Sequence, residues 1–113
     1  MIFVAVLVQV VKNDMAKKSK TKAEREHMAK VAALGCLVCS ECLGIEGTPA
    51  ELHHPIGWAG LGKRASHYEV ISLCPTHHRN GGYGVAIHAG KKKWEENFKT
   101  QEEFLEIVKQ KLS

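Results

Sequence analysis

Histidine and cysteine gather in the middle of the chain, in short motifs with the spacing of metal ligands. Six of the seven histidines lie between Glu51 and His88, and the four cysteines lie between Cys36 and Cys74. Imidazole nitrogen and thiolate sulfur are ligands that zinc and related ions prefer in proteins. This concentration indicates metal binding, and it holds enough ligands for two sites.

The first site is predicted from a Cys-x-x-Cys motif and a Cys-x-x-His motif. Cys36, Cys39, Cys74 and His77 have the number and types of ligands of a closed, tetrahedral zinc site. Cys42 is an alternative to Cys39, and the two-residue spacing favours Cys39. Because three cysteines crowd into seven residues, zinc in a reducing compartment is favoured over disulfides. A thiol redox site is disfavoured, since no βαβ pattern surrounds the motif.

A second group of histidines remains once His77 is assigned to zinc. His53 and His54 are neighbours, and on a β-strand their side chains would point to opposite faces. Such a pair suits a division of roles, in which one histidine binds a metal ion and the other acts as a base. His78 and His88 are then left for the same centre. A purely structural zinc module has no need of these four additional histidines.

Two helices are predicted from capping boxes, in which a threonine is followed by a glutamate three residues later. Thr21 and Glu24 start the first helix, and Gly35 is placed to end it just before the first cysteine motif. Thr100 and Glu103 start a terminal helix with an apolar stripe at helical spacing.

The segments between these helices predict a hairpin and short helices. Residues 50–54 and 68–73 are expected to be its two strands, joined by a glycine-rich loop over 55–66. Cys74-Pro75 begins a short helical turn that residues 80–82 end, and residues 91–98 predict another short helix. The fold class is therefore α+β.

The chain of 113 residues is long enough for one small domain with a modest core. Only 6% of its residues are aromatic, so a bound metal would add stability that the core lacks. The net charge of +4 is a mild bias toward polyanions, and it does not by itself indicate nucleic-acid binding.

The N-terminal segment is set apart by composition, so we expect residues 1–22 to lie outside a domain over 23–113. Residues 1–11 are almost wholly apolar, but no positive charge precedes them and the run is too short to span a bilayer. We interpret 1–14 as an upstream extension, with Met15 as the natural start. A short β-branched strand is the alternative. Residues 12–22 predict a flexible basic arm, which either tracks phosphates or only aids solubility.

The joined motifs resemble a known group of enzymes. Glu-Leu-His53-His54-Pro, followed by Ile-Ser-Leu-Cys74-Pro-Thr-His77-His78-Arg, resembles the ββα-metal motif of the HNH endonuclease superfamily. Together with Arg64-Ala-Ser-His67 and Val-Ala-Ile-His88-Ala-Gly, the pattern is similar to the phage recombination enhancement function (Ref) nucleases, a RecA-dependent family. The resemblance covers residues 23–105.

This resemblance implies a small, zinc-stabilised ββα-metal domain, treble-clef-like and flanked by helices. It implies a divalent ion, Mg²⁺ or Mn²⁺, with His54 as the general base and His53, His78 and His88 as its ligands. An HNH motif often carries asparagine at its middle position. Here the nearest candidate is His67, which would orient the base or the loop, or contact DNA.

The activity that the resemblance implies is metal-dependent DNA cleavage by a one-metal mechanism, in phage or prophage recombination. Its partners would be DNA and a RecA filament in the cytoplasm, with no membrane. Residues expected to hold flanking phosphates are Lys63, Arg64, Arg79, Lys91, Lys92 and Lys93. The alternative is a zinc-stabilised, DNA-binding accessory module with little or no nuclease activity.

Overall fold

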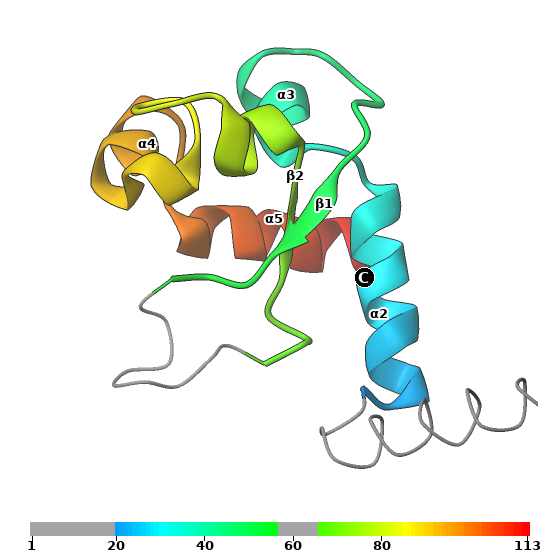
Figure 1. The fold of residues 1–113 in the computed structure, drawn as a ribbon. Helices are drawn as coiled ribbons and strands as arrows, with labels where there is room; N and C mark the ends of the chain where they lie inside the picture. The colour runs from blue at the N-terminus through cyan, green and yellow to red at the C-terminus, as the bar shows by residue number, and fades with distance from the viewer. Residues whose placement is uncertain (1–19, 57–65) are drawn as a thin grey trace, which may run out of the picture.

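A two-stranded antiparallel sheet lies among helices in a small α+β domain (Figure 1). The computed structural model describes residues 20–56 and 66–113. The elements, in chain order, are α2 (Lys22–Ala33), α3 (Leu37–Cys42), β1 (Glu51–His53), β2 (Ile71–Leu73), the helical turns η1 (Thr76–Asn80) and η2 (Ile87–Ala89), α4 (Lys91–Asn97) and α5 (Gln101–Leu112). The expected 1–14 extension, most of the basic arm and the centre of the glycine-rich loop lie outside the described residues.

Both predicted capping boxes are confirmed. At the start of α2, the Glu24 N–H donates to Thr21 Oγ1 (3.1 Å), and the Thr21 N–H donates to Glu24 Oε1 (2.8 Å). Thr100 and Glu103 make the same two bonds at the start of α5 (3.1 and 2.9 Å). Gly35 follows α2 with a φ of 77°, and a Cβ there would lie 3.0 Å from the Thr48 carbonyl oxygen. Local sequence signals therefore place the ends of these helices.

The hairpin is present, with strands shorter than expected. Its three residue pairs match β1 to β2 in antiparallel register, with His53 opposite Ile71. The predicted second strand began at Tyr68, but residues 66–69 form a turn. The Glu69 N–H donates to the Ser66 carbonyl (2.9 Å), and the Tyr68 N–H donates to Ser66 Oγ (2.9 Å). These local bonds compete with the ladder, so β2 begins only at Ile71.

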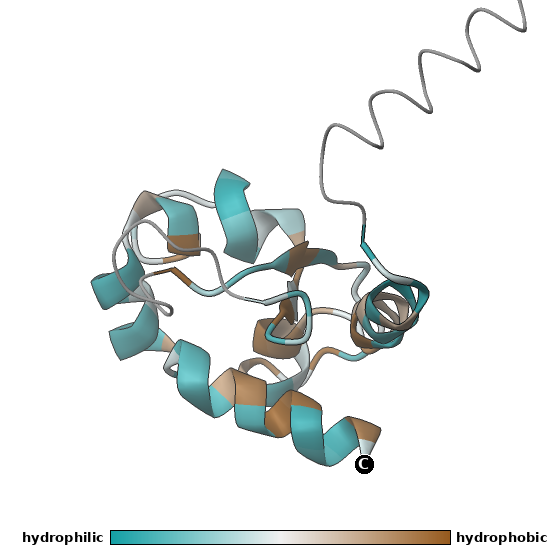
Figure 2. Ribbon diagram, turned by 90° about the horizontal axis from the view of Figure 1, so that it is seen from below, coloured by the Kyte–Doolittle hydropathy of each residue, from teal (hydrophilic) through white to brown (hydrophobic). Residues whose placement is uncertain are grey.

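The core lies between the hairpin and the helices. β2 is buried along its whole length, and it packs against α2, α3 and α5. The largest fully buried side chains include Trp94 of α4 and Phe104 of α5, whose ring centroids are 5.4 Å apart. In Figure 2, brown and teal alternate along α5, as expected of a helix with one apolar stripe. This packing holds β1, β2 and η1 in fixed positions.

Within 20–56 and 66–113, no helix combines the length and apolar character needed to cross a bilayer.

Candidate metal centres

Three cysteines and one histidine from distant parts of the chain meet in a buried cluster. Nδ1 of His77 lies 3.6 Å from Cys36 Sγ, 3.7 Å from Cys39 Sγ and 3.2 Å from Cys74 Sγ. A tetrahedral ion with Zn–S bonds of about 2.3 Å and a Zn–N bond of about 2.0–2.1 Å holds sulfur and nitrogen about 3.6 Å apart. All four side chains are buried. The cluster therefore has the donor set and the spacing of a structural zinc site.

Helix α3, which was not expected, brings two of these ligands together. Cys36 is its N-cap, and the Cys39 N–H donates to Cys36 Sγ (3.5 Å). This capping bond holds the Cys36 sulfur over the first turn of α3, where Cys39 also lies. Cys42, the alternative to Cys39, sits half-buried at the end of α3 and outside the four-ligand cluster.

Burial sets the protonation of this cluster before metal binds. Burial raises the pKa of Cys36 to about 12, and it lowers the pKa of His77. At neutral pH the metal-free cluster therefore has a protonated Cys36 thiol and a neutral imidazole. Zinc binding must displace thiol protons, so zinc affinity depends on pH.

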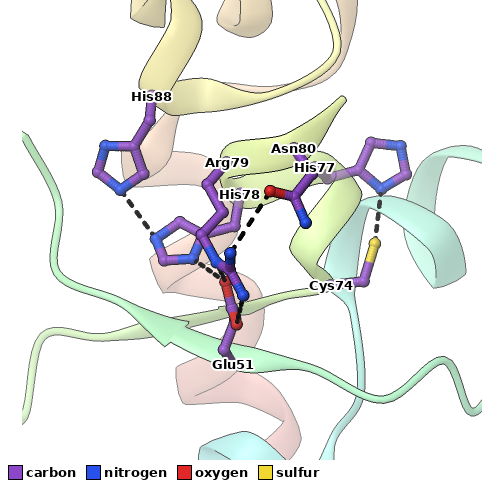
Figure 3. Close-up of polar contacts among 7 residues, drawn as sticks. All are labelled: Glu51, Cys74, His77, His78, Arg79, Asn80 and His88. Atoms are coloured by element: carbon purple, nitrogen blue, oxygen red, sulfur yellow. Dashed lines mark hydrogen bonds and ion pairs between the residues drawn. The ribbon is translucent and has the colours of Figure 1, made fainter. Parts of the chain in front are cut away.

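Three histidines form a second cluster that could hold a metal ion. One ring nitrogen from each of His53, His78 and His88 lies within 4.8 Å of the others. His78 Nε2 and His88 Nε2 face each other at 2.9 Å (Figure 3). The ring of His53 lies 5.1 Å from that of His78 and 5.3 Å from that of His88, centroid to centroid. The second cluster thus unites a strand, η1 and η2.

The turn η1 divides two adjacent histidines between the two clusters. Figure 3 shows His77 directed toward Cys74, and His78 directed toward Glu51 and His88. The turn is a single π-type turn, closed by the Gly81 N–H donating to the Thr76 carbonyl oxygen (2.9 Å). Single π-type turns are frequent at functional sites, and this one needs Gly81. A Cβ at Gly81 would collide with the Thr76 carbonyl oxygen and with Val85.

Glu51 fixes the orientation of His78, a role that the sequence analysis did not assign. Glu51 Oε1 accepts a hydrogen bond from His78 Nδ1 (2.7 Å), and the same carboxylate accepts from Arg79 at Nε (2.7 Å) and at the terminal nitrogen (3.2 Å). Arg79, and then His78, hold the pKa of Glu51 down to about 2. An ionised carboxylate only accepts, so Nδ1 of His78 carries a proton, and Nε2, which faces His88, is the nitrogen left for a metal ion. Strand alternation was the available signal, because Glu51 stands two residues before His53.

The two remaining ligand candidates are neutral at physiological pH. Burial lowers the pKa of His53 to about 4, and this effect outweighs the hydrogen bond to Gln101, which raises the pKa. Burial, reinforced by His78, also lowers the pKa of His88. Neutral rings keep a lone pair for a metal ion, whereas imidazolium rings do not.

His54 and His67, the expected base and its orienting residue, lie side by side. Nε2 of His54 is 3.0 Å from Nδ1 of His67, and the two rings are nearly perpendicular at 75°. His54 directly follows β1 and is half-buried. The structure therefore places His67 in contact with the expected base, although the two are thirteen residues apart.

Comparison with known families supplies an independent observation. Residues 20–113 match the family described as "Recombination enhancement, RecA-dependent nuclease". The chain belongs to this family. Comparison with curated proteins gave no match. Membership agrees with the RecA-dependent part of the resemblance noted in the sequence, and it associates the chain with nuclease activity in recombination, with DNA as substrate and with RecA.

The basic side chains that we expect to bind DNA in this member of the RecA-dependent nuclease family fall into three groups by their surroundings. Lys63 and Arg64 lie outside the described residues. Arg79 is bonded to Glu51, with about half of its side chain exposed. The exposed residues Lys91, Lys92 and Lys93 open α4, where the first and third pair with glutamates of the same helix at 4.0 and 3.8 Å.

Proposed function

We propose that this protein is an HNH-type endodeoxyribonuclease that cleaves phosphodiester bonds with one catalytic divalent ion. The observation that carries the proposal is the cluster of His53, His78 and His88, which is separate from the Cys₃His cluster and includes His53, the chain neighbour of His54. A structural zinc needs only the first cluster. The hairpin followed by the turn η1 supports the ββα-metal assignment, because β1, η1 and η2 each supply a ligand.

The donor set indicates which ion fits. Three imidazole ligands suit first-row transition ions, whereas Mg²⁺ prefers oxygen ligands, so Mn²⁺ fits better than Mg²⁺. Ligands about 2.1 Å from an ion, at adjacent corners of an octahedron, lie about 3.0 Å apart. The 2.9 Å between the facing Nε2 atoms of His78 and His88 agrees with that spacing. Zn²⁺ in the Cys₃His cluster completes the proposed metal content.

The chain's own residues supply the rest of the chemistry. The bound ion would polarise the scissile phosphate and stabilise charge on the leaving oxygen. His54 takes a proton from the attacking water, which a neutral histidine can do near pH 7. His67 holds the ring of His54 in place through the contact at 3.0 Å.

Basic side chains would hold the DNA on either side of the cut. Arg79 and Lys91–Lys93 are exposed, and they are proposed to contact flanking phosphates with Lys63 and Arg64. Such contacts position a duplex or a single strand without reading its sequence. RecA filaments are the proposed partner in phage or prophage recombination, on the basis of family membership.

Cleavage of supercoiled and single-stranded DNA, with Mn²⁺ or Mg²⁺ and with or without a RecA filament, tests the proposal. We expect His54→Ala to lose activity by about 10²- to 10⁴-fold, as for removal of a general base. His78→Ala should lose cleavage together with Mn²⁺ binding. His27→Ala, which changes a histidine outside both clusters, should cleave as the wild type does.

The same assay separates the enzyme from a DNA-binding accessory module. If the wild type and His54→Ala behave alike under every condition, the nuclease assignment fails. DNA binding with no cleavage by the wild type, across both ions and with RecA present, would instead support the accessory module.

A further inference from the structure

Gln101, the first residue of α5, contacts the histidine cluster from the far end of the sequence. Its side chain is 3% exposed, and its Oε1 lies 2.9 Å from Nε2 of His53. Neither the sequence motifs nor the proposed reaction assigns a role to this residue. A buried, uncharged polar group that spans forty-eight residues to reach a candidate metal ligand needs a reason.

The backbone of Ile56 fixes which way round the Gln101 amide lies. The Ile56 N–H donates to Gln101 Oε1 (2.8 Å), and Gln101 Nε2 donates to the Ile56 carbonyl (3.0 Å). A flipped amide would set an NH₂ group against an N–H group and one carbonyl against another. The two bonds to Ile56 therefore determine that oxygen, not nitrogen, faces His53.

An oxygen acceptor at this position determines the tautomer of His53. Carbonyl oxygen can only accept, so Nε2 of His53 must carry the proton in the 2.9 Å contact. In a neutral imidazole the lone pair then lies on Nδ1. With Nε2 engaged by Gln101, Nδ1 is the nitrogen that His53 can offer to an ion shared with His78 and His88.

We propose that Gln101 is a positioning residue that holds His53 as its Nε2–H tautomer and leaves Nδ1 to bind the catalytic ion. This inference rests on the proposed function and deepens it, because it names the group that prepares a ligand. The arrangement parallels Glu51, which accepts from Nδ1 of His78 and leaves Nε2 for the ion. Acceptors behind metal-bound histidines typically fix both the tautomer and the ring orientation.

The burial of each position explains why one acceptor is charged and the other neutral. Glu51 is partly exposed and shares its charge with Arg79, so its carboxylate stays solvated. Gln101 is buried, and a carboxylate in its place would carry an unpaired charge into the core. The Gln101 N–H donates to Glu95 Oε2 (2.8 Å), which ties the start of α5 to α4. The first residue of helix α5 thus contacts the histidine cluster, while the rest of the helix packs on the core.

The tautomer can be read by ¹⁵N NMR of the histidine rings in the zinc-loaded protein without manganese. We expect His53 to be protonated on Nε2 in the wild type. Gln101→Met keeps the length of the side chain and removes the acceptor, so it should release His53 into a mixture of tautomers. Gln101→Glu, protonated because burial disfavours its charge, keeps a carbonyl acceptor for His53 and a donor for the Ile56 carbonyl, so it should keep the Nε2–H form. Gln110→Met changes an exposed glutamine of the same helix, and it should leave His53 unchanged.

Binding of Mn²⁺ to the same proteins, followed by calorimetry, gives the second measurement. We expect Gln101→Met to weaken binding by about 10- to 100-fold with zinc retained, as for other acceptors behind metal-bound histidines. Gln110→Met should bind as the wild type does. A wild-type His53 protonated on Nδ1, or a Gln101→Met affinity within twofold of the wild type, would overturn the inference.

Both measurements are independent of cleavage, so they separate this inference from the proposed function. A wild type with the Nε2–H tautomer and Gln101-dependent Mn²⁺ binding, but no cleavage of DNA, would uphold the role of Gln101 and refute the nuclease. If Gln101→Met fails to fold, the wild-type tautomer and the Gln101→Glu spectrum still decide the question.

Discussion

Replacing Cys74 by alanine should unfold the domain, because a zinc ion in the Cys₃His cluster would hold three separate segments of a small core together. The cluster connects the start of α3, the end of β2 and η1, and its ligands come from positions as far apart as Cys36 and His77. Structural zinc contributes about 10–16 kcal/mol at pH 7. At about 0.05–0.15 kcal/mol per residue, a chain of 113 residues has a net stability of roughly 6–17 kcal/mol. The two ranges overlap, so loss of zinc removes most or all of the stability.

Cys42→Ala is the matched control for this substitution. Cys42 packs at the edge of the core and lies outside the four-ligand cluster, so its loss should cost only about 1 kcal/mol, as for an ordinary point mutation. Zinc content by mass spectrometry and thermal unfolding by circular dichroism test both variants. Cys74→Ala should lose zinc and show no cooperative transition. A folded, zinc-loaded Cys74→Ala variant, or a zinc-free Cys42→Ala variant, would refute the assignment of ligands.

Three further predictions concern the acceptor behind His78, helix capping and pH. Glu51→Gln should weaken Mn²⁺ binding by about 10- to 100-fold in calorimetry, because His78 loses a charged acceptor; unchanged affinity would contradict this role. Thr100→Ala should lower the free energy of unfolding in urea by about 1 kcal/mol, since it removes an N-cap bond, and a cost near zero would show that the cap is dispensable. Zinc should be lost to a chelator more readily at pH 5.5 than at pH 7.5. The metal-free Cys36 thiol has a pKa of about 12, so protons compete with zinc for its sulfur. A zinc affinity that does not change with pH would be inconsistent with thiolate ligands.

Structural features that depend on residues close together in the chain were predictable from the sequence. The capping boxes at Thr21 and Thr100 satisfy backbone groups three residues away, so the pattern alone locates both helix starts. The meeting of the Cys₃His side chains was also predicted, because paired short motifs restrict which side chains can meet. Helix α3 was missed because the cysteine spacing suggested only a turn.

Features that depend on distant contacts were not predictable in the same way. Glu51 meets His78 across twenty-seven residues, and Gln101 meets His53 across forty-eight. Glu51 begins the Glu-Leu-His53-His54-Pro motif but had no assigned role, Gln101 had none either, and both contact histidines only once the hairpin, η1 and α5 have packed. The sequence therefore predicted the candidate ligands, and the folded structure was needed to show which groups orient them.

Anomalous diffraction from crystals grown with Mn²⁺ tests the presence of two separate metal centres most directly. We expect zinc among Cys36, Cys39, Cys74 and His77, and manganese among His53, His78 and His88. A single metal position at the cysteines, with manganese absent from the three histidines or bound elsewhere, would contradict the claim of a separate catalytic centre.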